Sequence, residues 1–293
     1  MKAAEAKSEN FVKKKSLWSD AWERLKRNRL AMFGLFIVLF AILLAAFADQ
    51  IAPYHYDFQN YSDALQGPSK AHWFGTDNFG RDILSRVIYG ARASLFVGAL
   101  AVMISAIVGG VLGTVAGYYG GIVDNVIMRF IDILLAIPAT LLAIAIAATL
   151  GSGIVNTTIA IGISNIGRFT RTTRAAVLSV RGEEYIEAAR AVDASDARIM
   201  LKYVFPNSFA PMLIQFTLNI STSILSAAGL SFIGLGIQPP SPEWGAMLSA
   251  GRAYIRDYWH LTVFPGLAIM LTVYGFNLLG DGLRDALDPR LKD

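Results

Sequence analysis

Long apolar blocks separated by polar segments limit the fold of this chain more than any other feature of its sequence. Leu30 to Ala48 and Leu261 to Leu279 are two such blocks, each close to the ~20 residues that an α-helix needs to cross a hydrocarbon core of about 30 Å. Only 16% of the 293 residues are charged, whereas soluble domains have about a quarter. The sequence therefore predicts an all-α polytopic membrane protein with about six transmembrane helices.

Polar segments set the expected boundaries between these helices. The N-terminal segment carries an amphipathic pattern, with Leu17, Trp18, Ala21, Trp22 and Leu25 on one helical face. The expected divisions are an N-terminal segment (1–29), a first span (30–48), an external loop (49–93), a five-helix core (94–285) containing a charged loop (181–208), and a tail (286–293). Within the core we expect helices at 94–118, 126–150, 157–180, 211–235 and 261–279, with Pro138 kinking the second of them.

Basic residues indicate which polar segments face the cytoplasm. Of the 26 Lys and Arg residues, most lie in the N-terminal segment, in and just before the charged loop, and at the C-terminus. Cytoplasmic loops carry an excess of Lys and Arg, so both termini and the charged loop are expected inside. The net charge of +4 then reflects topology and gives no indication of nucleic-acid binding.

The charged loop, at its centre, has the features of a helical hairpin. Glu183 and Glu184 complement the positive end of a helix dipole, and the alanines that follow favour a helix. Asp193 to Asp196 is expected to form a turn, after which Ser195 caps a second short helix that Pro206 ends. The first helix would have two faces, one with Tyr185, Ala189 and Val192 and the other with Glu183, Glu187 and Arg190.

A hairpin of this size cannot bury its own apolar face, so it predicts a partner protein. The triplet Glu187 to Ala189, followed at the right distance by Phe205 and Pro206, resembles the EAA loop of ABC importer permeases, whose helix docks on a cytoplasmic ATPase. That family usually has Gly where this chain has Asp193 and Leu where it has Phe205. The resemblance assigns the ATPase-coupling role to Glu183, Tyr185, Glu187, Ala188, Ala189, Arg190, Asp193, Ser195 and Pro206.

Three further segments resemble the dipeptide, oligopeptide and nickel branch of these permeases, specifically its second, C-type subunit. They are His72 to Asp82, Gln238 to Met247 and Gly280 to Pro289. For the Asp and Arg residues of the first segment, we favour a structural role over a solvated loop with local ion pairs. The resemblance implies a type I importer fold in a bacterial or archaeal cytoplasmic membrane. It also implies the partners: a homologous second permease, two ATPases that bind ATP and Mg²⁺, and an extracellular or periplasmic solute-binding protein.

Several polar residues within the expected spans need a role. Arg168, Arg171 and Arg174 share one side of a helix, and Arg168 lies deepest, where arginine is costly. Arg168, Asn219 and Ser223 are the candidates for lining a translocation pathway. Arg129 and Asp132, one turn apart, could pair with each other. Gly109, Gly113 and Gly117 make a strip that favours close helix packing.

Other classes of function receive little support from the sequence. There is no Gly-x-x-x-x-Gly-Lys-Ser/Thr phosphate loop, no cysteine, no pair of histidines at metal-ligand spacing and no nucleophile beside a base. The chain is therefore expected to be a transport subunit without a cofactor of its own. An ion-coupled transporter or channel remains the main alternative, although no carboxylate lies deep in a span. Di- or oligopeptides are the expected cargo, with nickel chelates, glutathione or sugars as alternatives.

Overall fold

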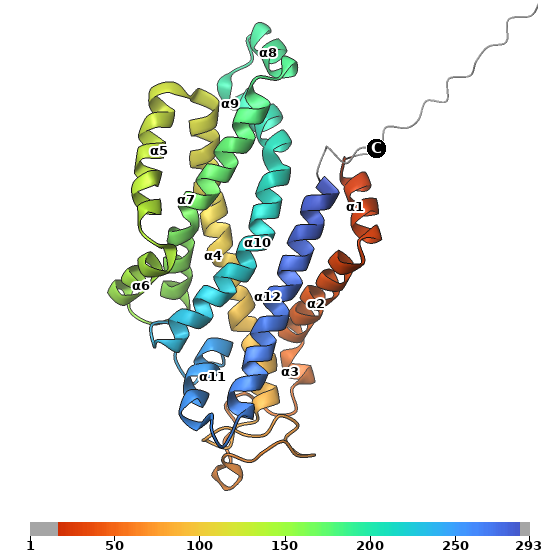
Figure 1. Cartoon of the computed structure of the whole chain (residues 1–293), viewed down its shortest axis with the longest axis vertical. Coiled ribbons are helices and arrows are strands. Elements are labelled where there is room, and N and C mark those ends of the chain that lie inside the picture. Colours follow the sequence, from red (N-terminus) through yellow and green to blue (C-terminus); the bar gives the residue numbers. More distant parts are fainter. Residues whose placement is uncertain (1–16, 288–293) are drawn as a thin grey trace, which may run out of the picture.

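The computed structural model describes residues 17–287, which form an elongated bundle of helices (Figure 1). Helix formation follows from the apolar blocks, because a chain in lipid must satisfy its backbone hydrogen bonds within each segment. The α-helices are α1 (Leu17–Arg27), α2 (Arg29–Ala46), α3 (Ala48–Ile51), α4 (Ile83–Tyr119), α5 (Gly121–Ala136), α6 (Ala139–Leu150), α7 (Ile154–Arg181), α8 (Glu184–Ala191), α9 (Asp196–Ile199), α10 (Phe205–Phe232), α11 (Trp244–Gly251) and α12 (His260–Leu287). Short η segments are η1 (Tyr61–Asp63), η2 (Met200–Val204, a π-helix) and η3 (Arg252–Tyr254). The all-α prediction is confirmed.

Four helical stretches in the described part of the chain are long and apolar enough to cross a membrane. They are α2, α4, α12 and the stretch Asp196–Phe232, which runs from α9 to the end of α10. The pair α5 and α6 becomes a fifth if it crosses as one bent unit. Helix α7 has 28 residues but is outside this set, since its arginines and asparagines lower its hydropathy. The structure thus contains four or five candidate crossings by length and hydropathy, and α7 would bring the number to the six that the sequence predicted.

The glycine strip of α4 brings this helix against α7, as predicted. A Cβ atom placed on Gly113 would lie 2.5 Å from the carbonyl oxygen of Thr170, and one on Gly109 would lie 2.6 Å from Cβ of Phe169. Only glycine permits backbones to approach so closely. The α4–α7 pair therefore forms the centre of the bundle, with α10 packed against both helices.

Helix α4 begins at Ile83 and not at residue 94, where the sequence analysis placed its start. Asp82 caps this helix by accepting a hydrogen bond of 2.8 Å from the amide of Ser85. The prediction allotted only about 20 residues to the span, whereas α4 has 37 residues and is about 55 Å long. Its first turns therefore project beyond the thickness of a hydrocarbon core.

Pro138 interrupts the third apolar block more strongly than the kink we expected. Helix α5 ends at Ala136, α6 begins at Ala139, and their axes differ by 85°. Pro138 stands at the N-terminal cap of α6, where its missing N–H removes no helical hydrogen bond. The block is therefore a broken pair of helices.

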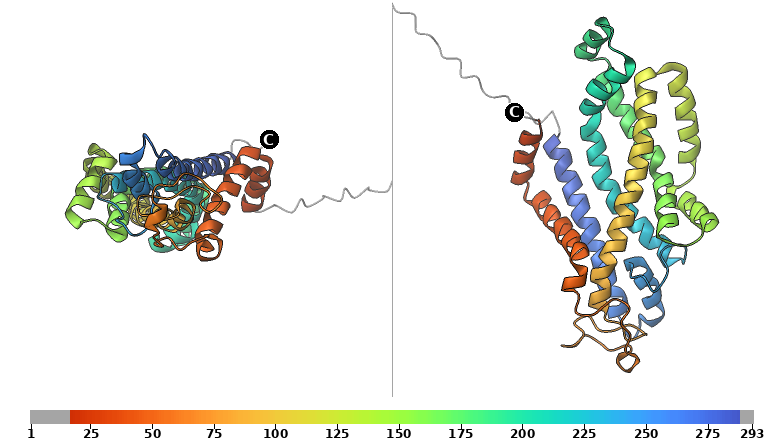
Figure 2. Two further views of the ribbon diagram at one scale, coloured as in Figure 1. Left: turned by 90° about the horizontal axis from the view of Figure 1, so that it is seen from below. Right: turned by 180° about the vertical axis from the view of Figure 1, so that it is seen from behind.

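The polar segments gather at the two ends of the bundle (Figures 1 and 2). Helices α1, α8 and α9 and the end of α12 lie at one end, and residues 52–82 lie at the other, near α11. Both described chain ends thus share an end with the charged loop. We call this the loop end, and we call the opposite one, which the sequence analysis expects outside the membrane, the outer end.

Candidate functional site

The charged loop buries a different face from the one that the sequence suggested. Ile186 is fully buried and Ala189 is 7% exposed, whereas Tyr185 is 40% and Val192 78% exposed. The predicted grouping of Tyr185, Ala189 and Val192 as one face is therefore wrong. The helix presents Ile186 and Ala189, three residues apart, to its own chain.

Helices α8 and α9 pack on the ends of α4 and α7. Ile186, Ala189 and Ile199 form a cluster with Tyr118 of α4 and Val177 of α7. The Tyr118 hydroxyl donates a 2.7 Å hydrogen bond to Asp196 Oδ1, and the Arg190 guanidinium lies 5.4 Å from the centre of the Tyr118 ring. The expectation that the hairpin cannot bury an apolar face without a partner is thus wrong for this side of it.

The turn between α8 and α9 forms where we expected it. Asp193 has φ of 55°, a left-handed conformation that glycine adopts freely and that Asp tolerates better than most residues. The Ala194 amide donates to the carbonyl of Ala189 and closes the turn. Ser195 stands at the cap position of α9, but its side chain makes no capping hydrogen bond. The turn is therefore held by the backbone.

Pro206 does not end the second helix, which corrects another expectation. The chain runs from α9 through η2 into α10, and Pro206 lies in the first turn of α10. The Phe205 amide bonds to the carbonyl of Met200, five residues back, so the helix widens just before the proline. A wider turn relieves the clash of a proline ring with the carbonyl four residues earlier. The loop is consequently continuous with a bundle helix.

The outward side of the loop carries both charge and apolar area. Glu187 and Arg190 are exposed. Partial burial, with a smaller effect of Glu183, raises the pKa of Tyr185 and keeps its hydroxyl neutral. Four of the exposed apolar residues, which we call the docking surface, are Tyr185, Ala188, Val192 and Leu201. Leu201, 74% exposed, was missed because the sequence analysis assigned faces only to the first helix.

The arginines of α7 bond to α5. Arg171 reaches Asp132 at 2.7 Å and Arg174 reaches Asp124 at 2.5 Å. The suggested pair of Arg129 with Asp132 is therefore replaced by a contact between helices, which helical spacing alone could not reveal. The Arg168 side chain is exposed and makes no hydrogen bond or ion pair with another residue within 17–287.

The other two pathway candidates lie inside the bundle. Asn219 is 3% exposed and Ser223 is fully buried, one turn apart on α10. In this conformation neither side chain can contact a solute. Arg168 alone of the three candidates lies on the surface of the chain.

The His72 to Asp82 segment forms a buried ionic network, as the structural interpretation predicts. Asp77 accepts from Arg81 at 2.7 Å and lies 3.7 Å from Arg86. His72 lies 2.9 Å from Asp82. All five side chains are at most 12% exposed. Buried charges are stable only when they are paired, so this network holds the segment 72–82 on α4. It gives no indication of a catalytic site.

Metal binding receives no support from the geometry. Within residues 17–287, no three His, Asp or Glu side chains are grouped so that they could hold a metal ion.

Two protein families match this sequence. Residues 109–293 match the family described as binding-protein-dependent transport system inner membrane component. Residues 16–68 match the N-terminal transmembrane domain of oligopeptide transport permease C.

Curated relatives align with nearly the whole chain. The dipeptide transport system permease protein DppC of Alkalihalophilus pseudofirmus is 51% identical over 94% of this chain and 91% of its own length. The glutathione transport system permease protein GsiD of Escherichia coli is 50% identical over the same shares.

Among solved structures, the MetNI methionine ABC transporter in an inward-facing conformation is similar with a TM-score of 0.56 and 16% identity. The match covers 69% of this chain and 96% of that one. An amino acid ABC transporter is similar with a TM-score of 0.53, also at 16% identity, over 68% of this chain and 92% of that one. At such identity these likenesses concern the fold alone.

Proposed function

Because this chain belongs to the family of binding-protein-dependent transport system inner membrane components, in its oligopeptide permease C branch, we propose that it forms half of the pathway of an ATP-driven importer of short peptides. It is a multi-pass inner-membrane subunit of an ABC importer. The other half of the pathway would come from a homologous permease. ATP and Mg²⁺ would be bound by two ATPase subunits, and a solute-binding protein outside would deliver the cargo.

The observation that carries the coupling role is the construction of the charged loop. One side of it is packed on Tyr118 and Val177, with the Arg190 guanidinium over the Tyr118 ring, and the rest of it exposes the docking surface and Glu187. An exposed apolar surface rimmed by charges is typical of a protein interface. We therefore assign Tyr185, Ala188, Val192 and Leu201 to contact with the ATPase, and Glu187 and Arg190 to its orientation.

Transport would proceed by alternating access. Closure of the ATPases on ATP would displace the charged loop, and the continuous helix from Asp196 to Phe232 would carry that displacement into the bundle. The two permeases would then open outward and receive a peptide. ATP hydrolysis would return them to the inward-open state.

The docking role is tested at Val192, because its side chain is 78% exposed and its replacement leaves the packed side intact. With Val192→Glu, we expect peptide-dependent ATP hydrolysis by the reconstituted complex to fall about tenfold, the effect of roughly 1.4 kcal/mol at an interface. Ile122→Glu is the control, since Ile122 is 82% exposed at the start of α5. Unchanged ATPase binding and activity in Val192→Glu would remove the docking assignment.

Ala189, to which the resemblance assigned a coupling role, is unsuitable for this test. It packs against Tyr118 and Val177, so a bulky charge there would disturb the loop itself whether or not an ATPase binds.

Short peptides are the favoured cargo because of the match to oligopeptide permease C and the 51% identity to a dipeptide permease. Glutathione, itself a modified tripeptide, is the second candidate because of the 50% identity to a glutathione permease. Uptake of labelled dipeptide and of labelled glutathione by the complex with its own binding protein separates them. Transport of glutathione alone would replace the first proposal by the second.

A further inference from the structure

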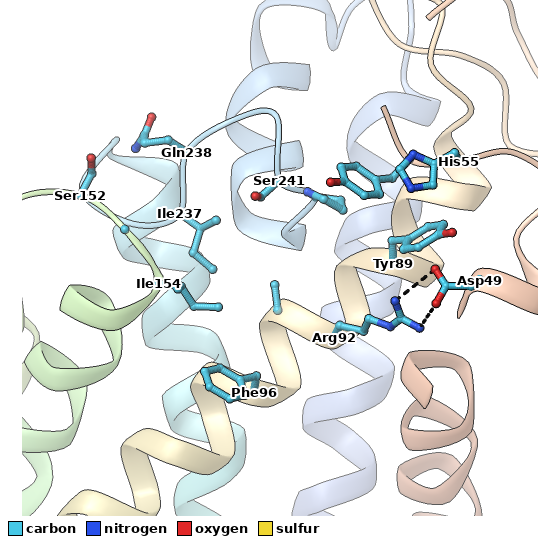
Figure 3. Close-up of a pocket in the computed structure, with 14 residues that line it drawn as sticks. Asp49, His55, Tyr89, Arg92, Phe96, Ser152, Ile154, Ile237, Gln238 and Ser241 are labelled. Carbon is cyan, nitrogen blue, oxygen red and sulfur yellow. Dashed lines mark hydrogen bonds and ion pairs between the residues drawn. The ribbon is translucent and has the colours of Figure 1, made fainter. Parts of the chain in front are cut away.

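The outer end contains a cavity of about 880 Å³ that no role described above uses (Figure 3). It lies between the first half of α4, α3, the turn before α7 and the segment that follows α10. Its volume is in the range of small-molecule sites, which also combine apolar walls with a few polar groups.

Arg92 shows where this cavity lies relative to the membrane. Its Nε donates to the carbonyl of Ala45 at 2.6 Å, and its Nη2 donates to that of Ala46 at 3.3 Å. These carbonyls end α2, whose 18 residues are about 27 Å long, close to the thickness of a hydrocarbon core. A cation is favourable at a helix C-terminus. Arg92 therefore stands at the outer boundary of the hydrocarbon, and the cavity opens there.

The charged wall of the cavity is formed by Asp49 and Arg92. Both guanidinium Nη atoms bond to the two carboxylate oxygens, at 2.8 and 3.3 Å (Figure 3). Arg92 thus uses its donors on α2 and on Asp49. The Asp49 side chain remains 57% exposed, and a carboxylate has about four acceptor positions. What this wall still offers a ligand is free acceptor positions on the Asp49 carboxylate, whose charge the Arg92 guanidinium balances.

Three aromatic rings, those of His55, Tyr56 and Tyr89, line the cavity together with this carboxylate. The ring centres of His55 and Tyr89 are 5.6 Å apart, and those of Tyr56 and Tyr89 are 5.2 Å apart. Hydrogen bonding from Arg92, and then from Tyr89, lowers the pKa of Asp49, so the carboxylate is ionised at neutral pH. The faces of aromatic rings attract an ammonium group, and the acceptor positions of Asp49 that Arg92 leaves free can take its hydrogen bonds.

The remaining walls of the cavity can contact the apolar side chain and the amide groups of a small zwitterionic ligand. Phe96, Ile154 and Ile237 form an apolar floor, and Gln238 and Ser152 lie on the wall opposite Asp49 (Figure 3). An apolar side chain can rest on the floor while amide groups face the polar wall. No fully buried polar atom has to be exposed for a ligand to enter, because Asp49 and Gln238 are already exposed.

We propose that this cavity binds the amino-terminal residue of a short peptide at the entrance of the permease, with the α-ammonium group on Asp49 and the first side chain on the floor of Phe96, Ile154 and Ile237. The proposal rests on the proposed function, because it takes a peptide as the cargo. It assigns this chain its own recognition of the cargo, separate from that of a binding protein.

The test uses the complete permease–ATPase complex in phosphatidylcholine nanodiscs without binding protein. The probe is the dipeptide photo-leucine–alanine, whose first side chain carries a diazirine, and its N-acetylated form. We expect light to label Phe96, Ile154 or Ile237, and acetylation to lower the labelling about fivefold, as expected for loss of one exposed ionic contact. Labelling confined to other segments, or equal with both probes, would overturn the proposal.

Variants then identify the group that binds the ammonium. Asp49→Asn should lower labelling by the free dipeptide about fivefold and abolish the difference between the two probes. Asp57→Asn is the matched control, since Asp57 is another exposed acid of the outer end, pairs with His55 and does not line the cavity. Equal losses in both variants, or none in Asp49→Asn, would contradict the assignment.

Two further measurements separate the alternatives. If the cavity is a site for a zwitterionic lipid, phosphatidylethanolamine in the nanodiscs will suppress labelling, and the peptide assignment is wrong. Peptide uptake by the same preparation with binding protein distinguishes the two proposals. Uptake without labelling of the cavity rejects only the subsite, whereas absence of peptide uptake rejects the proposed function.

Discussion

In the segment 72–82 at the outer end of this permease the charged groups are buried against one another, whereas in the charged loop at the loop end they are exposed. His72, Asp77 and Arg81 are each less than 10% exposed, but every charged residue from Glu183 to Lys202 is exposed. Burial of charges fixes a segment at the expense of desolvation, and exposure leaves them available to another protein. The segment 72–82 is therefore held by its own chain, and the charged loop leaves exposed the side that we propose to bind an ATPase.

Removal of one partner from the buried network should have the largest effect. Asp77→Ala leaves Arg81 and Arg86 without their carboxylate, and a broken buried pair typically costs about 3–5 kcal/mol. Hydrogen exchange should show residues 63–86 opening far more often than in the parent protein. Glu187→Ala at the loop end should change local stability by less than about 0.5 kcal/mol. Similar losses of stability from Asp77→Ala and Glu187→Ala would contradict the distinction between buried and exposed charges.

The packed side of the charged loop should give the next largest effect. Ala189→Arg forces a charge against Tyr118 and Val177 and should destabilise α8 by about 2–3 kcal/mol. Exchange of the α8 amides in the permease without ATPase measures this cost. Slow exchange as in the parent chain would mean that the contact with α4 and α7 does not hold the loop.

A smaller effect is expected from the polar contact beside it. Tyr118→Phe removes the hydrogen bond to Asp196 but keeps the ring, and Asp196 is exposed to water. We expect a loss of about 1 kcal/mol in the stability of α9, detectable by the same exchange measurement. A loss as large as that of Ala189→Arg would show that the hydrogen bond, and not apolar packing, organises the loop.

Acid should have the smallest effect, which can be measured at the exposed Asp49–Arg92 pair of the outer end. The pKa of Asp49 is lowered in the folded protein, so the contact with Arg92 contributes fully above the unfolded value of about 3.9 and is lost as the pH falls through the lower folded value. Exchange at α3 should be constant from pH 7 to 5 after correction for the intrinsic rate and should increase below about pH 4. An increase in exchange already at pH 6 would indicate that a histidine, and not Asp49, controls the stability of α3.

Sequence patterns predicted those features of the fold that depend on local spacing. The strip of Gly109, Gly113 and Gly117, the interruption at Pro138 and the turn at Asp193 were all found where expected. Contacts between distant segments were not predictable, because helical spacing cannot choose between Arg129 and Arg171 as the partner of Asp132.

The errors in the candidate site have physical causes. The start of α4 was misplaced because a 20-residue span was assumed, although Asp82, three residues before Ser85, provided an N-cap signal. The buried face of α8 was misassigned because the contribution of Tyr118 and Val177 comes from other helices. Which side of an exposed helix faces its own chain depends on tertiary packing, and the sequence of that helix does not specify it.

The unbroken helix from Asp196 to Phe232 has a mechanical consequence. A continuous helix about 55 Å long joins the loop end to the interior, so a tilt imposed near Asp196 is transmitted along it towards Asn219 and Ser223. The widened turn at η2 and Pro211 inside α10 are two places where this helix could bend and absorb part of that tilt. Under the proposed coupling, the stiffness of these two places would set how much of a movement of the ATPases reaches the middle of the bilayer.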